Sequence, residues 1–121
     1  MPGRRADKTG DQLPLFVYGT LRRGERAAHL LAGAVRARAL ARARGARLAL
    51  DLDYPAVSFA GDQEVEGELV WLDPQRFDVI MALIDDYEGA PDLFERVQVM
   101  VATDHGEVEA HAYEWRGRAA P

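Results

Sequence analysis

The sequence predicts an α+β domain, built as a small mixed β-barrel of about six strands with one or two flanking helices. Most of the chain between residues 15 and 115 consists of short segments in which apolar and polar residues alternate, as in half-buried strands. One longer segment, residues 73–89, carries its apolar residues at helical spacing instead. Many short strands with few helices are typical of a curled or barrel-like sheet.

The N-terminal half is expected to begin with a buried strand. Residues 15–18, "LFVY", form a continuous apolar run of the kind that is covered on both faces. A loop over residues 20–26 leads to "AAHLLAGA", which predicts a short helix ended by Gly33. From Val35 the residues alternate with period two and predict a strand, and "ARLALDLDY" predicts another strand after Gly45.

The next segments predict two more strands. "YPAVSF" is expected to be extended, because Pro55 holds Tyr54 out of the helical region. "GDQ" at residues 61–63 is expected to be a turn. "EVEGELVWL" then alternates, with its glutamates on one face. The other face is formed by Val65, Gly67, Leu69 and Trp71.

The segment "DPQRFDVIMALIDDYEG" predicts the main helix. Asp73 is a suitable N-cap, Pro74 suits the first turn, and Gly89 is expected to end the helix. One apolar stripe is made by Phe77, Ile80, Met81 and Ile84.

Two final strands are predicted around a hairpin. "ERVQVMVAT" and "EVEAHAYEW" both alternate, and "DHG" between them is expected to be the turn. The second strand places three aromatic side chains on one face: His111, Tyr113 and Trp115.

The composition fits a single domain whose core needs no disulfide or metal to stabilise it. Of the 121 residues, 48% are hydrophobic, which suffices for a core. We expect residues 1–13 to be a disordered N-terminal tail, residues 14–116 a single domain, and residues 117–121 a frayed C-terminal tail.

Several classes of protein are excluded by what the sequence lacks. It has no cysteine, which rules out disulfides, thiolate nucleophiles and cysteine-ligated zinc. Its three histidines have no metal-like spacing, so no metal site is expected. No apolar run approaches the roughly 20 residues of a membrane span, and no secretory signal follows the basic N-terminus. We therefore expect a cytoplasmic location and no membrane partner.

The charge of the chain argues against a nucleic-acid partner. The net charge is −5 and the sequence pI is near 5.1, whereas phosphate binding requires a basic face. The local exception, "AVRARALARARGAR", has no aromatic residue on which a base could stack. Its arginines are expected to lie on solvated strand faces: Arg36, Arg38, Arg42, Arg44 and Arg47.

Three acids crowd the C-terminal end of the predicted helix, in "LIDDYEG". Asp85, Asp86 and Glu88 lie where the helix dipole disfavours negative charge. One interpretation is an ordinary acidic surface turn. The other is a carboxylate whose pKa is raised by repulsion and partial burial, so that it serves as general base and then as general acid.

The segment "VYGTL" is the second candidate for chemistry. After the strand ends, the backbone amides of Gly19, Thr20 and Leu21 can form a small anion-binding nest, with the Tyr18 hydroxyl beside it. A simple turn is the alternative interpretation. Glu25 stands where a phosphate-binding loop needs lysine, which excludes nucleotide binding by that motif.

Taken in order, these segments resemble a known family. The series "FVYGTLRRGE … YPAV … VEGELVWLD … LIDDYEG … FERVQVMV … AHAYEW", from Leu15 to Trp115, is similar to the gamma-glutamylcyclotransferase superfamily. It is most like the short gamma-glutamylamine cyclotransferase-like proteins. The resemblance implies a small mixed β-barrel with flanking helices, in agreement with the strand pattern.

The resemblance also implies an activity and a site. The reaction is the cyclisation of a small-molecule gamma-glutamyl amide to 5-oxoproline with release of a free amine, without a cofactor. The loop from Tyr18 through Gly19 and Thr20 to Leu21 would hold the glutamyl head, and Glu88 would be the catalytic acid/base. The acids upstream of Glu88 would support it.

Two positions depart from the family pattern. Many relatives carry an asparagine directly after "RRGE", whereas this chain continues with Arg26, Ala27 and Ala28. Relatives often have tyrosine at the position of Phe94. These changes bear on the choice of substrate more than on the reaction. A non-catalytic binding module on the same fold, and a tailoring enzyme that removes a gamma-glutamyl protecting group in natural-product biosynthesis, remain as alternatives.

Overall fold

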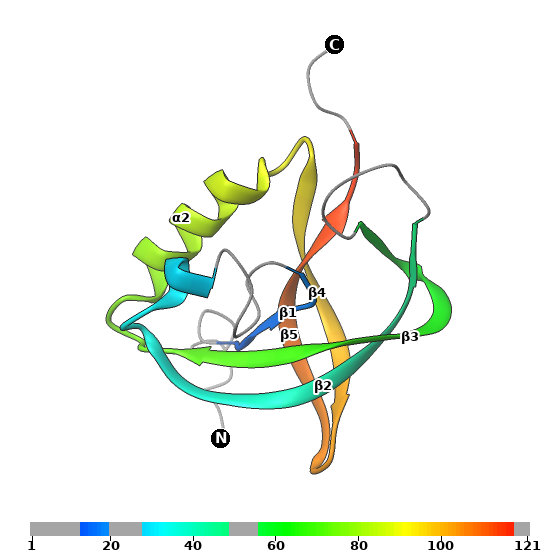
Figure 1. Cartoon of the computed structure of the whole chain (residues 1–121), viewed down its shortest axis with the longest axis horizontal. Helices are drawn as coiled ribbons and strands as arrows, with labels where there is room; N and C mark the ends of the chain where they lie inside the picture. The colour runs from blue at the N-terminus through cyan, green and yellow to red at the C-terminus, as the bar shows by residue number, and fades with distance from the viewer. Residues whose placement is uncertain (1–12, 20–27, 49–55, 118–121) are drawn as a thin grey trace, which may run out of the picture.

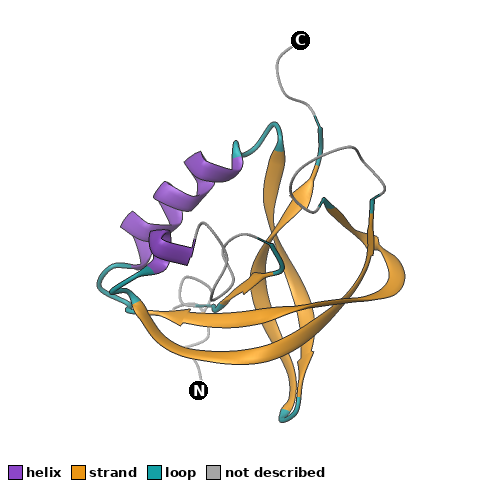
Figure 2. Cartoon of the chain, in the orientation of Figure 1, coloured by secondary structure: helices purple, strands orange, loops and turns teal. Residues whose placement is uncertain are grey.

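The computed structural model describes residues 13–19, 28–48 and 56–117 (Figure 1). Together these residues form five strands, one α-helix and one 3₁₀ helix (Figure 2). In chain order the elements are β1 (Leu15–Val17), η1 (Ala28–Leu31), β2 (Val35–Arg47), β3 (Val57–Leu72), α2 (Phe77–Glu88), β4 (Phe94–Thr103) and β5 (Gly106–Trp115).

The strands close into a barrel in the order β1-β3-β2-β4-β5. Every neighbouring pair is antiparallel except the closing pair, in which β1 runs parallel to β5 with Leu15 opposite His111. The barrel is therefore mixed, and α2 lies against its outer surface (Figure 1). The predicted α+β barrel is confirmed.

The described residues contain five strands rather than about six, because the chain does not leave the strand at two positions where the sequence predicted a strand end. β2 continues through Gly45, and the turn predicted at residues 61–63 is wrong, since these residues lie inside β3. The register passes directly from Gly45↔Gln63 to Ala46↔Ser58, so that residues 59–62 are an irregular bulge. A Cβ at Gly45 would stand 2.6 Å from the main-chain oxygen of Ser58, so glycine serves close approach rather than chain reversal.

Two apolar clusters hold the fold together. The barrel interior contains the inward residues of the strands: Phe16, Tyr18, Ala41, Ala43, Val57, Val65, Leu69, Val101, Ala110 and Ala112. The second cluster lies between the barrel and the helices and includes the predicted stripe of α2, with Leu15, Val17, Val70 and Tyr113 from the strands. β1 contributes to both clusters, as its continuous apolar run predicts.

The helix α2 begins later than predicted but ends where predicted. Asp73 caps only the preceding turn, where its Oδ1 accepts the main-chain N–H of Gln75 at 3.0 Å, and the helix starts at Phe77. Gly89 has a left-handed φ of 69°. Its N–H donates to the oxygen of Asp86 at 3.1 Å and that of Ala90 donates to Asp85 at 2.9 Å, a Schellman ending.

The smaller elements also follow the sequence. The predicted turn around residues 104–106 joins β4 and β5, and the helix predicted before Gly33 is a single 3₁₀ turn, with φ of 80° at that glycine. Among the helices described, there is none whose length and apolar character would carry it across a membrane.

Candidate active site

Glu88 is the last residue of α2 and continues its buried stripe. It follows Ile84 by one helical turn, at a position where the pattern calls for another apolar residue. The carboxyl group is largely withdrawn from water, and this burial raises the pKa of Glu88 to about 7. A carboxylic acid in this range is partly protonated and partly ionised at neutral pH.

Tyr18 stands at the end of β1 with its ring in the barrel interior. Its hydroxyl donates a hydrogen bond of 2.5 Å to the main-chain oxygen of Tyr113. Burial raises the pKa of Tyr18, the charge of Glu88 raises it further, and Arg47 opposes these effects. The hydroxyl therefore stays protonated, and Glu88 is close enough for its charge to act there.

Tyr113 on β5 is hydrogen-bonded to an acid that belongs to an ion pair. Its hydroxyl donates to Oδ1 of Asp85 at 2.5 Å, and Nη2 of Arg96 lies 3.1 Å from Oδ2 of the same carboxylate. Burial raises the pKa of Tyr113, and the hydrogen bond to Asp85 and the charge of Glu88 raise it further. The acid three residues before Glu88 is thus held by a tyrosine and an arginine.

Each of the two tyrosine hydroxyls already donates its single proton in a hydrogen bond. Tyr18 donates to a carbonyl and Tyr113 to a carboxylate, so toward any further group each oxygen can only accept a hydrogen bond. With the carboxylate of Glu88 nearby, the group presents several acceptors and one titratable acid. Such an arrangement suits an ammonium or amine group, which supplies N–H donors and gives up a proton.

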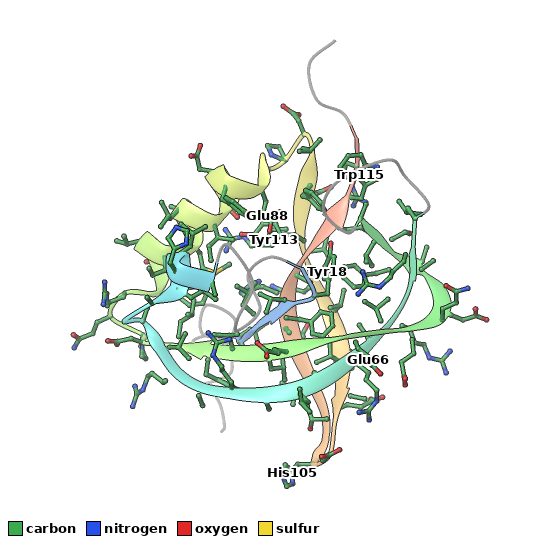
Figure 3. The ribbon with its side chains drawn as sticks, viewed as in Figure 1. Tyr18, Glu66, Glu88, His105, Tyr113 and Trp115 are labelled. Carbon is green, nitrogen blue, oxygen red and sulfur yellow. The ribbon has the colours of Figure 1, made fainter. Side chains whose placement is uncertain are left out.

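Figure 3 shows Glu88, Tyr113 and Tyr18 together between α2 and the strands β1 and β5, with Glu66 and His105 well away from them. Of the residues singled out in the sequence, the structure thus brings Tyr18 and Glu88 together. Gly19 follows Tyr18 in a bend. The predictions for Thr20, Leu21 and Ala27 fall outside the described residues.

The other predicted positions are also placed. Asp86 is exposed, whereas Asp85 lies against the site and makes contacts that support Tyr113. Phe94 is buried, and its ring meets that of Trp115 edge-on at 5.2 Å between centroids. No role was predicted for Tyr113 from the sequence, although its place on one face of the last strand, beside His111 and Trp115, was the signal that could have indicated one.

A metal centre does not emerge from the residues that are described. No group of three or more histidine, aspartate and glutamate side chains lies together in them in a way that could hold an ion.

Comparison with known proteins identifies what the chain is similar to. The profile described as "Gamma-glutamyl cyclotransferase, AIG2-like" matches residues 15–121. The gamma-glutamylaminecyclotransferase of Bos taurus is 29% identical over 122 residues, which cover 88% of this chain and 68% of that protein.

Solved structures share the fold. The crystal structure of an AIG2-like protein from Mus musculus has a TM-score of 0.66 at 24% identity, over 90% of this chain and 80% of that one. YkqA from Bacillus subtilis has a TM-score of 0.69 at 30% identity, over 86% of this chain and 36% of that longer chain.

Proposed function

Because the chain belongs to the gamma-glutamyl cyclotransferase, AIG2-like family, we propose that it cyclises a gamma-glutamyl amide to 5-oxoproline and releases a free amine. The observation that supports the proposal most is Glu88, a carboxyl group whose pKa is raised by burial to about 7 and whose charge acts on the Tyr18 hydroxyl. The relative from Bos taurus, a gamma-glutamylaminecyclotransferase by name, supports an amine as the leaving group.

The proposed substrate carries its own nucleophile. The α-amine attacks the γ-carbonyl carbon, a C–N bond closes the five-membered ring, and the C–N bond to the leaving amine breaks. The neutral α-nitrogen loses one proton and the leaving nitrogen gains one, so that atoms and charge balance. Because the attack is intramolecular, holding the substrate in its folded conformer supplies much of the acceleration.

Glu88 is proposed to carry the proton. As carboxylate it accepts the proton of the attacking nitrogen, and as carboxylic acid it returns that proton to the leaving nitrogen. A pKa near the working pH favours both steps, since neither form is scarce. Proton transfer by a positioned side chain typically contributes about 10²- to 10⁴-fold to the rate.

The surroundings of Glu88 supply the remaining roles. The oxygens of Tyr18 and Tyr113 can accept N–H groups of the substrate's amine, because their own protons are bound elsewhere. By resemblance to the family, the amides of residues 19–21 would hold the glutamyl head and stabilise the oxyanion. A gamma-glutamyl small molecule is thus the proposed partner, and a cytoplasmic location remains part of the proposal.

The test is the release of 5-oxoproline from a panel of gamma-glutamyl amines. Glu88→Gln should lower kcat by about 10²-fold or more, whereas Glu66→Gln, an equal change on the exposed outer face of β3, should have little effect. Activity that survives Glu88→Gln would remove Glu88 from the mechanism. Tight binding of gamma-glutamyl amines without turnover would favour the non-catalytic binding module.

A further inference from the structure

The arginines of β2 fall into two sets according to the face of the strand. Arg38, Arg42 and Arg44 lie on the outer face, where β3 presents its glutamates. There Nη1 of Arg38 lies 2.9 Å from Oε1 of Glu68, and Nε of Arg42 lies 3.3 Å from Oε2 of Glu64. These two pairs place Arg38 and Arg42 in a cross-strand charge ladder.

Arg47 belongs to the other face. It continues the odd-numbered inward series of Ala41 and Ala43, and it pairs with Val57, which is completely buried in the barrel interior. Directly opposed residues of an antiparallel pair project to the same side of the sheet. Arg47 therefore turns toward the inner side at the end of its strand, where its side chain reaches water.

The end of the barrel where Arg47 lies is also the end that holds the site. Phe59, just beyond the partner of Arg47 on β3, packs edge-on against the Tyr18 ring at 6.1 Å between centroids. The positive charge of Arg47 acts on the Tyr18 hydroxyl, the group on which the Glu88 charge also acts. The described part of the chain thus places a cation and an acid/base around one tyrosine.

Arg47 has no ion-pair partner among the described residues. Besides Glu88, the acid that acts on Tyr18 is Glu114, and both of its oxygens accept hydrogen bonds. Its Oε2 accepts the main-chain N–H of Phe59 at 2.7 Å, and its Oε1 accepts Nη1 of Arg116 at 2.6 Å. No carboxylate among residues 13–19, 28–48 and 56–117 forms an ion pair with the guanidinium of Arg47, which leaves it able to bind an external anion.

We propose that Arg47 binds a carboxylate group of the substrate and so determines which gamma-glutamyl compounds the site accepts. The inference rests on the proposed function for the identity of the substrate. Every gamma-glutamyl amide carries an α-carboxylate on the glutamyl head, and an amino-acid leaving group carries a second carboxylate. An arginine binds either through two parallel N–H bonds.

The test uses three compounds that differ by one carboxylate at each step. Gamma-glutamylalanine carries both carboxylates, gamma-glutamylethylamide only the α-carboxylate, and 4-aminobutyrylethylamide neither. Arg47→Gln is compared with Arg44→Gln, which removes an exposed outward-facing arginine from the same strand. Thermal unfolding of both variants checks that the fold is retained.

Arg47→Gln should lower kcat/KM by about ten- to a hundredfold for compounds that carry the recognised carboxylate. Loss for the first two compounds alone assigns the α-carboxylate, and loss for gamma-glutamylalanine alone assigns the carboxylate of the leaving group. Equal effects on all three compounds, or effects no larger than those of Arg44→Gln, would overturn the inference.

Binding is measured separately from turnover. Calorimetric Kd values for the three compounds are compared between Glu88→Gln and the double variant Glu88→Gln/Arg47→Gln. A wild-type protein that releases no product from the gamma-glutamyl compounds refutes the proposed function, whereas the inference about Arg47 fails if the Kd values do not change or no compound binds. The two failures are therefore distinguishable.

Discussion

Replacing Glu88 by glutamine should stabilise the folded protein, and the gain should grow with pH. The pKa of Glu88 rises from 4.5 to about 7 on burial, so the folded state favours the protonated acid. The wild-type protein therefore loses stability as the pH rises from about 4.5 through 7, because the buried group must ionise. One pKa unit corresponds to about 1.4 kcal/mol, which makes the loss roughly 3 kcal/mol at pH 8.

Glutamine has the size of the protonated acid and does not ionise. The free energy of unfolding of Glu88→Gln should equal that of the wild type near pH 4 and exceed it by roughly 3 kcal/mol at pH 8. Urea unfolding at several pH values, followed by the fluorescence of Trp71 and Trp115, measures this difference as a midpoint shift on the order of 1 M. Glu66→Gln is the control and should show no such trend.

A difference that does not depend on pH would refute this reasoning. It would mean that Glu88 titrates in the folded protein as it does in the unfolded chain. A gain that appears equally in Glu66→Gln would assign the effect to net charge rather than to burial.

Two further predictions concern the site. The pH dependence of kcat/KM for the wild type should show an apparent pKa near 7 that is absent from the residual activity of Glu88→Gln, as initial rates between pH 5 and 9 would measure. Tyr18→Phe should lower the free energy of unfolding by about 1–2 kcal/mol in urea, because the main-chain oxygen of Tyr113 loses its donor; an unchanged midpoint would argue against that hydrogen bond.

The local patterns of the sequence predicted the elements well. The stripe of α2, its glycine ending and the alternation of the strands all depend on neighbouring residues, and the structure confirms them. The breaks predicted at Gly45 and at residues 61–63 were wrong. The sequence alone does not distinguish a glycine required for close contact between strands from a glycine in a turn.

The surroundings of the site depend on the closed barrel. The pairing of Glu88 with the "YGT" segment came from a family resemblance rather than from any local pattern. The bond from Tyr113 to Asp85 joins residues 28 positions apart, and nothing near either residue in the sequence indicates it. Likewise the inward orientation of Arg47 becomes visible only when its partner on β3 is known to be buried.

The closing pair of the barrel, β1 and β5, joins two segments that lie far apart in the sequence. The hydrogen bond from Tyr18 to Tyr113 joins residues 95 positions apart, so β1 can complete its contacts only after β5 is in place. During synthesis the barrel cannot close until β5 has left the ribosome. β1 contributes only residues Leu15–Val17, all of them buried, so loosening this short strand would expose apolar side chains of both clusters to water.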